Sequence, residues 1–214
     1  GHWLKLANQK IIDIKKRKKI PILVGGTGLY FKALTEGLVN IPNIPIKFRN
    51  KIRSLHKKIG SKQFFLKLIK LDPLVRNHIN PLDSQRAIRA YEIKLFTKKS
   101  MYDYFKNTKA KYKQDDFYKI FINIQREELL KKIESRSKNM IKQGLILEVK
   151  KFLKLKVPKK MTASKAIGIN EIRAYLDKKT QIPEVIEKIS IKTRQYAKRQ
   201  MTWGRGHMKD WNKL

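Results

Sequence analysis

The stretch that decides the fold reads Pro21-Ile22-Leu23-Val24-Gly25-Gly26-Thr27-Gly28-Leu29-Tyr30. An apolar run opens here directly into a glycine turn that carries one hydroxyl group. In α/β proteins, ligands bind at the carboxyl ends of sheet strands, where glycines let backbone amides approach a phosphate closely. We therefore expect a short strand over residues 20–24, followed by a phosphate-handling turn.

This expected strand lies close to Gly1, so no earlier segment supplies it with a sheet partner. The backbone N–H and C=O groups of a strand in a parallel sheet form hydrogen bonds with neighbouring strands. We therefore expect that the N-terminal part of a larger α/β domain is missing from these 214 residues.

The charge balance is the outlier of the composition. The chain has 52 Lys and Arg against 17 Asp and Glu, which gives a net charge of +35. A charge of this sign and size indicates a polyanionic partner, and nucleic acid is the first candidate. The alternative is that much of the lysine reflects an AT-rich coding sequence and covers a solvated surface.

Cysteine is absent, which excludes disulfides and thiolate metal sites and allows a reduced, cytoplasmic location. The four histidines have no metal-ligand spacing, and we assign no residue as a metal ligand. No apolar stretch reaches the ~18 residues that a membrane span needs, and nothing resembles a signal peptide.

The hydrophobic pattern divides most of the chain into helices. Two prolines within 40–45 mark a linker, and the pattern is helical from 46 to 106. We interpret 46–114 as a small all-helical domain inserted into an α/β core made of 1–45 and 115–214. The other expected elements are helices over 3–18, 30–38, 85–96 (capped by Asp83-Ser84), 126–143, 145–155, 163–176 and 183–203, a core strand within 117–124, a loop beginning at 158–160 and a loose polar tail from 204.

Five groups of residues, in order and spread over nearly all of the chain, match the pattern of one enzyme family. They are residues 21–34; Ile79-Asn80-Pro81 with 83–92; Arg126-Glu127-Glu128-Leu129 with Ile133, Arg136, Met140 and Gly144-Leu145; Lys165-Ala166-Ile167-Gly168; and 193–203. Together they resemble the tRNA dimethylallyltransferase family. One such motif alone would be weak, whereas five in sequence are specific.

The resemblance implies a P-loop-type parallel sheet core, here incomplete at the N-terminus, with an inserted all-helical tRNA-binding domain. It implies transfer of a dimethylallyl (isopentenyl) group from dimethylallyl diphosphate to the exocyclic amine of the adenosine 3′ of the anticodon. The implied partners are the tRNA anticodon stem-loop and dimethylallyl diphosphate with Mg²⁺, and we expect a cytoplasmic monomer with no membrane partner.

The largest departure from the family pattern concerns the N-terminal region. The family begins with a Walker A-like P-loop and a nearby aspartate that resembles a general base, and no G-x-x-x-x-G-K-[ST] occurs in this chain. We therefore expect the chain alone to be inactive. The alternative function is a non-catalytic tRNA-binding remnant. A P-loop kinase of small nucleotides is disfavoured, because kinases need neither the tRNA-contact segments nor this much positive charge.

At the diphosphate end, the resemblance implies that Thr27 contacts substrate as the catalytic residue. It also implies that Gly25, Gly26 and Arg136 bind the diphosphate, where amide and cationic donors oppose the charge that builds on the leaving group. Each of these roles has a structural alternative. Residues 25–28 can be only a tight turn in which Thr27 caps the next helix, and Arg136 can belong to a solvated helix face.

The residues that the resemblance assigns to tRNA binding are Arg49, Gln85, Arg86, Arg89, Lys165, Gly168, Lys198, Arg199, Gln200, Trp203 and Arg205. Arg86 and Arg89 lie three residues apart on one side of a helix, so they can fork onto phosphates or stack on a splayed base. Their alternative is pairing with Glu92 or nearby acids.

The other assignments carry alternatives too. The alternative for Arg49 is an ordinary exposed arginine. The alternative for Trp203 and Tyr196 is that they anchor the core. Lys165 stands where the family has arginine, and a point charge replaces a planar fork there. Ile169 and Asn170 also depart from the family pattern. We expect Gly168 to serve the backbone geometry of this loop.

Overall fold

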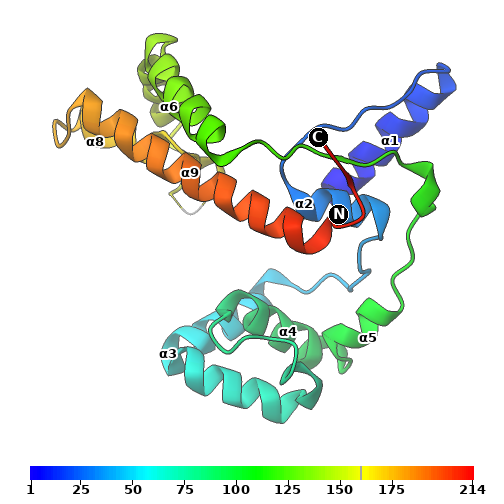
Figure 1. Ribbon diagram of the computed structural model, residues 1–214. Helices are drawn as coiled ribbons and strands as arrows, with labels where there is room; N and C mark the ends of the chain where they lie inside the picture. The colour runs from blue at the N-terminus through cyan, green and yellow to red at the C-terminus, as the bar shows by residue number, and fades with distance from the viewer. Residues whose placement is uncertain (160) are drawn as a thin grey trace. The chain divides into compact units, whose positions relative to one another are not determined.

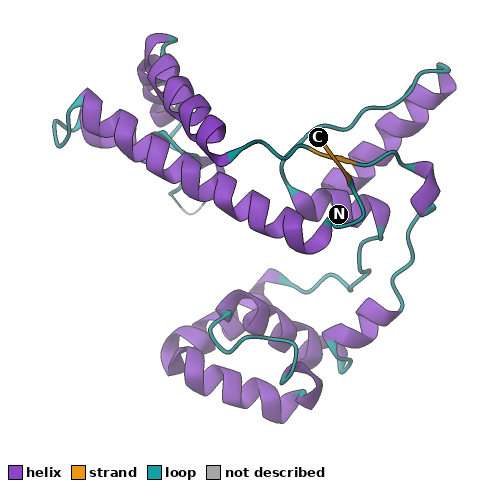
Figure 2. Ribbon diagram, in the orientation of Figure 1, coloured by secondary structure: helices purple, strands orange, loops and turns teal. Residues whose placement is uncertain are grey.

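The computed structural model describes residues 1–159 and 161–214, and nearly all of its regular structure is helical (Figures 1 and 2). Position 160, in the expected loop, lies outside the described residues. The elements are α1 (His2–Lys16), α2 (Gly28–Thr35), α3 (Ile46–Leu71), the 3₁₀ helix η1 (Pro73–Val75), α4 (Ser84–Thr97), α5 (Met101–Lys106), η2 (Gln114–Asp116), β1 (Ile120–Phe121), α6 (Arg126–Lys142), α7 (Leu145–Lys154), η3 (Ala163–Lys165), α8 (Ile169–Leu176), α9 (Ile182–His207) and β2 (Asn212–Lys213).

The chain folds into two compact units. One contains residues 1–23 and 29–117, and the other contains residues 24–28 and 118–214. The glycine turn thus belongs to the same unit as α9. The division expected from the sequence, with 46–114 as an inserted domain, stays a prediction.

The core of the first unit lies between α3 and α4. Asp83 caps α4 as expected, because its carboxylate accepts a hydrogen bond from the Arg86 amide at 3.0 Å. The helix that begins at Ile46 is kinked at Gly60, whose φ of 75° is accessible to glycine. The buried apolar side chains of this core are Ile44, Ile52, Phe64, Phe65, Leu68, Val75, Ile79, Ala87, Ala90, Ile93 and Met101.

The second unit is built on α9, which packs against α6 and α8. Gly144 ends α6 in a left-handed conformation with φ of 98°. The single helix expected over 163–176 is wrong. Gly168 has φ of 106°, so the segment forms η3 and then starts anew as α8. The core is made by Leu145, Val149, Ile169, Ile172, Val185 and Ile189.

The sheet of the described residues is a two-stranded parallel pair, in which Ile120 aligns with Asn212 and Phe121 with Lys213 (Figure 2). The expected loose tail is therefore wrong. Helix α9 continues to His207, and the following residues return to pair with β1. The Leu214 amide also donates to the Phe121 carbonyl at 3.2 Å. Tail polarity did not predict this because backbone groups make the pairing.

The strand expected over 20–24 is also wrong for this structure: these residues have no regular secondary structure and belong to no sheet. Ile20, Ile22 and Val24 are more than four-fifths exposed. An apolar segment becomes a strand only where a neighbour satisfies its backbone groups, and nothing within the described residues pairs with this one. Among those same residues, no helix combines the length and apolarity that crossing a membrane requires.

Candidate nucleic-acid interface and diphosphate turn

The glycine turn presents its backbone to solvent. Gly25, Gly26 and Thr27 are all exposed, and α2 begins immediately after them at Gly28. Exposed amides beside small residues can approach a phosphate closely. The geometry is therefore compatible with the expected diphosphate contact, which stays a prediction for all three residues.

The C-terminal end of α9 holds this turn in place. The Gln200 side-chain amide donates to the Gly26 carbonyl at 3.0 Å. The Trp203 ring fills the space beside Gly28 where any Cβ would stand. Two residues that the sequence assigned to tRNA binding thus contact the predicted diphosphate turn itself.

The remaining basic residues at this end of α9 are free to meet a ligand. Lys198, Arg199 and Arg205 are exposed. The Arg199 guanidinium lies 5.6 Å from the centroid of the Tyr196 ring, and Tyr196 is 45% exposed. Exposed aromatic rings among cations are typical of surfaces that bind single-stranded RNA.

Trp203 has a packing role as well. It stacks on His207 with ring centroids 4.4 Å apart and is partly buried against Gly28. Trp203 therefore acts in part as the core anchor that the sequence left open as an alternative. Tyr196 does not, because it is a surface residue. Base contact by Trp203 stays a prediction.

Arg136 lies exposed on α6, at the edge of the packed side that the buried Ile133 and Ser137 mark. Lys132 on the same helix pairs with Glu128 at 2.6 Å. A solvated helix face therefore accounts for what surrounds Arg136, and its diphosphate role stays a prediction.

The loop before α8 is shaped by Gly168. Its amide donates to Glu171 Oε2 at 2.8 Å, and Lys192 of α9 pairs with the same carboxylate. Burial raises the pKa of Glu171, but the hydrogen bonds from Lys192 and the backbone amides outweigh burial and lower it overall. Lys165 is exposed at the start of this loop.

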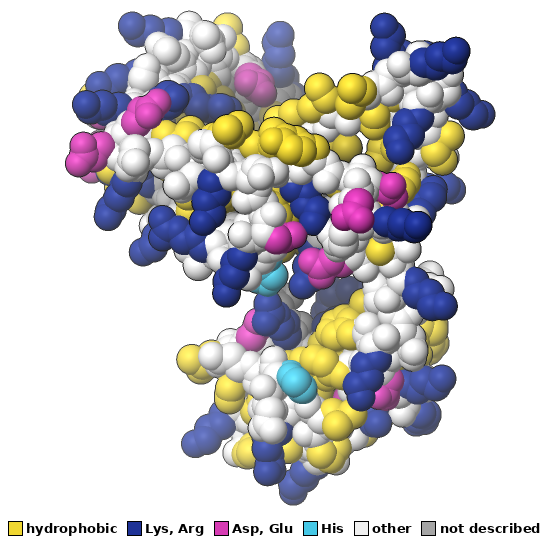
Figure 3. Space-filling model, turned by 45° about the vertical axis from the view of Figure 1, so that its right-hand side comes forward, with side chains coloured by type: hydrophobic (Ala, Val, Ile, Leu, Met, Phe, Trp, Pro, Cys, Tyr) yellow, Lys and Arg dark blue, Asp and Glu magenta, His cyan; other side chains and the backbone are white. Residues whose placement is uncertain are grey.

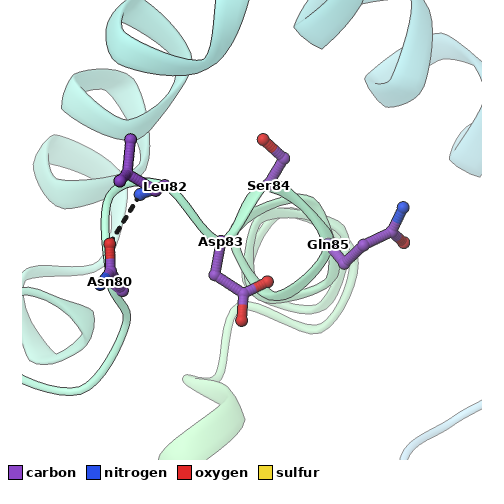
Figure 4. A pocket seen from close by; sticks show the side chains of 5 residues that line it. All are labelled: Asn80, Leu82, Asp83, Ser84 and Gln85. Carbon is purple, nitrogen blue, oxygen red and sulfur yellow. Dashed lines mark hydrogen bonds between the residues drawn. The ribbon is translucent and has the colours of Figure 1, made fainter. Parts of the chain in front are cut away.

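The start of α4 forms an open surface pocket lined by Asn80, Leu82, Asp83, Ser84 and Gln85 (Figure 4). The Leu82 amide donates to Asn80 Oδ1 at 2.9 Å, which shapes the turn before the helix. Gln85 is exposed beside this turn. Arg86 is 70% exposed and pairs with Asp83 at 3.3 Å. Both side chains are accessible to RNA.

Arg49 and Arg89 meet at one carboxylate. Glu92, on α4, is only 1% exposed and lies 3.3 Å from Arg49 Nε and 3.2 Å from Arg89 Nη1. The pairing with Glu92 that the sequence left open is thus present for Arg89, and Arg49 is not an ordinary surface arginine. Arg53, which sequence reasoning missed, joins them at 3.6 Å. Its spacing of four residues from Arg49 was the available signal.

Mg²⁺ favours carboxylate, carbonyl and phosphate oxygens. No group of three or more His, Asp or Glu side chains able to hold a metal occurs in the part of the chain that the structure describes. Binding of the Mg²⁺ ion that the resemblance implies stays a prediction.

Positive charge covers both units. On the face drawn in Figure 3, Lys and Arg side chains cover far more of the surface than Asp and Glu. The exposed glycine turn, the basic end of α9 and the basic start of α4 define the class: a basic, mostly helical protein with surfaces suited to phosphate and RNA.

Comparison with known proteins gives the family. The IPP transferase family model matches residues 1–207. The chain is 54% identical over 214 residues to a tRNA dimethylallyltransferase of Pelagibacter ubique (strain HTCC1062), covering all of this chain and 68% of that protein. It is 44% identical over 209 residues to one of Rickettsia massiliae (strain Mtu5), covering 97% of this chain and 58% of the relative. The chain belongs to the IPP transferase family.

Solved structures that resemble this chain belong to the same kind of enzyme. The full-length tRNA isopentenylpyrophosphate transferase of Bacillus halodurans aligns over 99% of this chain and 65% of its own, with a TM-score of 0.60 and 31% identity. A eukaryotic dimethylallyltransferase acting on tRNA aligns over 94% of this chain and 51% of its own, with a TM-score of 0.74 and 27% identity. The chain thus spans about half to two-thirds of the length of the relatives and structures that it matches.

Proposed function

We propose that this chain carries the tRNA-binding surface and the diphosphate turn of a tRNA dimethylallyltransferase. In the reaction, the exocyclic amine of the adenosine 3′ of the anticodon attacks the allylic carbon of dimethylallyl diphosphate. The new carbon–nitrogen bond replaces a carbon–oxygen bond, and diphosphate leaves. The amine gives its proton to the general-base aspartate that the family resemblance implies near the P-loop. A cytoplasmic location and a monomeric state belong to the same proposal.

One observation carries the proposal: the end of α9 both contacts the glycine turn and presents cations to solvent. Gln200 donates to Gly26, and Trp203 packs on Gly28, in the segment that resembles a tRNA contact. A tRNA held by this segment would therefore lie beside a diphosphate held by the turn. Holding two reactants together in this way lowers the entropic barrier to their reaction.

Each group has a definite task. The amides of Gly25 and Gly26 and the Thr27 hydroxyl donate to the diphosphate oxygens, where negative charge grows as the carbon–oxygen bond breaks. The target adenosine must leave its stack to reach the turn, and a base in a loop is inexpensive to unstack. Mg²⁺, when bound with the diphosphate, would neutralise part of its charge.

A second candidate is tRNA binding without transfer. It corresponds to the expectation, drawn from the family resemblance, that these 214 residues alone are inactive. Under this proposal the basic surfaces keep their role, and the glycine turn is only a structural turn.

Two measurements on the full chain test both candidates. The first is tRNA affinity at 50 and 200 mM salt, which we expect to fall by about 10³–10⁵ if 6–10 phosphates are contacted. The second is transfer of labelled dimethylallyl groups to tRNA. Binding with transfer supports the first candidate and contradicts the expectation that the chain alone is inactive. Binding without transfer agrees with that expectation and is the result that the second candidate requires.

The control for transfer is Thr27→Val, which removes the hydroxyl group and keeps the branched shape. Where the wild-type chain transfers the group, we expect Thr27→Val to reduce the rate of transfer without changing tRNA affinity, and Thr27→Ser to restore the rate. An affinity that does not respond to salt would contradict both candidates.

A further inference from the structure

Glu92 is buried in the first unit under three arginines that come from two helices. Its side chain is 1% exposed, and its oxygens lie 3.3 Å from Arg49 Nε, 3.6 Å from Arg53 Nε and 3.2 Å from Arg89 Nη1. We call these four residues the Glu92 cluster. A buried carboxylate needs such partners, because an unpaired charge removed from water is strongly unfavourable.

The Glu92 cluster carries more positive charge than the buried carboxylate can neutralise. Three guanidinium groups face one carboxylate, which leaves a surplus of two positive charges. Within residues 1–159 and 161–214, Glu92 is the one ion-pair partner found for each of the three arginines. The surplus is therefore available to an anion from outside the chain.

The arginines are also oriented for such an anion. Arg49 and Arg53 approach Glu92 through Nε, which leaves the donors of both terminal nitrogens unused by this contact. The side chains of Arg49, Arg53 and Arg89 are 35%, 50% and 38% exposed. Guanidinium groups held in this way present planar, multiple donors that suit phosphate oxygens.

We propose that Glu92 is a positioning residue that holds Arg49, Arg53 and Arg89 as one surface for RNA phosphates, with Arg53 as an additional RNA-contact residue. The inference rests on the proposed binding of tRNA. RNA is favoured over other anions because the net charge of the chain is +35 and the cluster adjoins the first turn of α4, with Gln85 and Arg86 exposed.

The decisive variant is Glu92→Gln, which keeps the shape of the side chain and removes its charge. Counting charges alone predicts tighter RNA binding, because the protein becomes more positive. Positioning predicts the opposite: the arginines lose their common partner and spread apart. We expect affinity for an unmodified tRNA transcript to fall about tenfold at 100 mM salt, which is roughly the contribution of one phosphate contact.

Arg53→Ala is the second variant, and its side chain is exposed enough that the fold does not depend on it. We expect a loss of about tenfold in affinity and a salt dependence reduced by about one ion. Lys51→Ala is its matched control. Lys51 is an exposed cation on the same helix, roughly opposite Arg49 and Arg53 at 100° per residue, and we expect it to change affinity by less than about twofold.

Thermal unfolding of each variant shows whether it is folded. Two results together support the inference. Folded Glu92→Gln binds tRNA more weakly than the wild type, and the tRNA affinity of Arg53→Ala depends less on salt than that of Lys51→Ala. Wild-type affinity in both variants, or tighter binding by Glu92→Gln, overturns it while the proposed function stands. A wild-type chain that does not bind tRNA overturns both.

Discussion

Gly204→Ala tests the packing that places α9 beside the sheet and the glycine turn. Gly204 is buried on α9, and a Cβ there would lie 2.5 and 2.7 Å from Cε2 and Cζ of Phe121 on β1. Alanine in a helix is favoured over glycine by about 0.8–1.0 kcal/mol. Forcing a methyl group into a packed site costs about 1–3 kcal/mol. The clash exceeds the gain in helix propensity, so we expect a net destabilisation of about 1 kcal/mol.

The matched control lies two residues further along the same helix. Gly206 has no atom within 4 Å of its Cβ position and is exposed, so Gly206→Ala keeps the propensity gain without the clash. We expect the Tm of Gly204→Ala, measured by circular dichroism, to lie below that of the wild type by about 2–4 °C for each kcal/mol of stability lost. Gly206→Ala should equal or exceed the wild type. An increase in Tm with Gly204→Ala as large as that with Gly206→Ala would refute the close contact with Phe121.

Two further changes probe the second unit. Glu171 has a lowered pKa, so its ionised contacts stabilise the fold above the ordinary value of 4.5 and are lost as pH falls through the lower folded value. Glu171→Gln should lower the free energy of unfolding at pH 7 by about 1–3 kcal/mol, because charged hydrogen bonds are lost, and this appears as a lower Tm. The difference in Tm from wild type should narrow at pH 3, and an equal difference at both pH values would contradict this. Gln200→Met removes the donor to the Gly26 carbonyl and should lower the free energy of unfolding by about 0.5–1.5 kcal/mol, measured by thermal unfolding. An unchanged Tm would show that the contact does not stabilise the turn.

The features that depend on neighbouring residues in the chain were predictable. The cap at Asp83, the break at Gly144 and the long helix after Gln181 follow from residue types whose preferred conformations are local. The family followed from the order of five sequence segments, which requires no knowledge of packing.

Features that depend on distant partners were not predictable. Pairing of β1 with Asn212–Lys213 joins segments more than ninety residues apart through backbone groups, which have no sequence signature. The same dependence explains why residues 20–24 have the composition of a strand and yet form none in this structure.

The sequence by itself determined which residues are candidates for the chemistry: a glycine turn with one threonine, arginines at helical spacing and a basic helix containing Trp203. Only the tertiary structure decided how they are grouped. Glu92 lies 43 residues from Arg49 in the chain, and Gln200 lies 174 from Gly26. Hydrophobic burial fixes the helices that bring these partners together, and a contact between distant residues is specified by that whole core rather than by either partner.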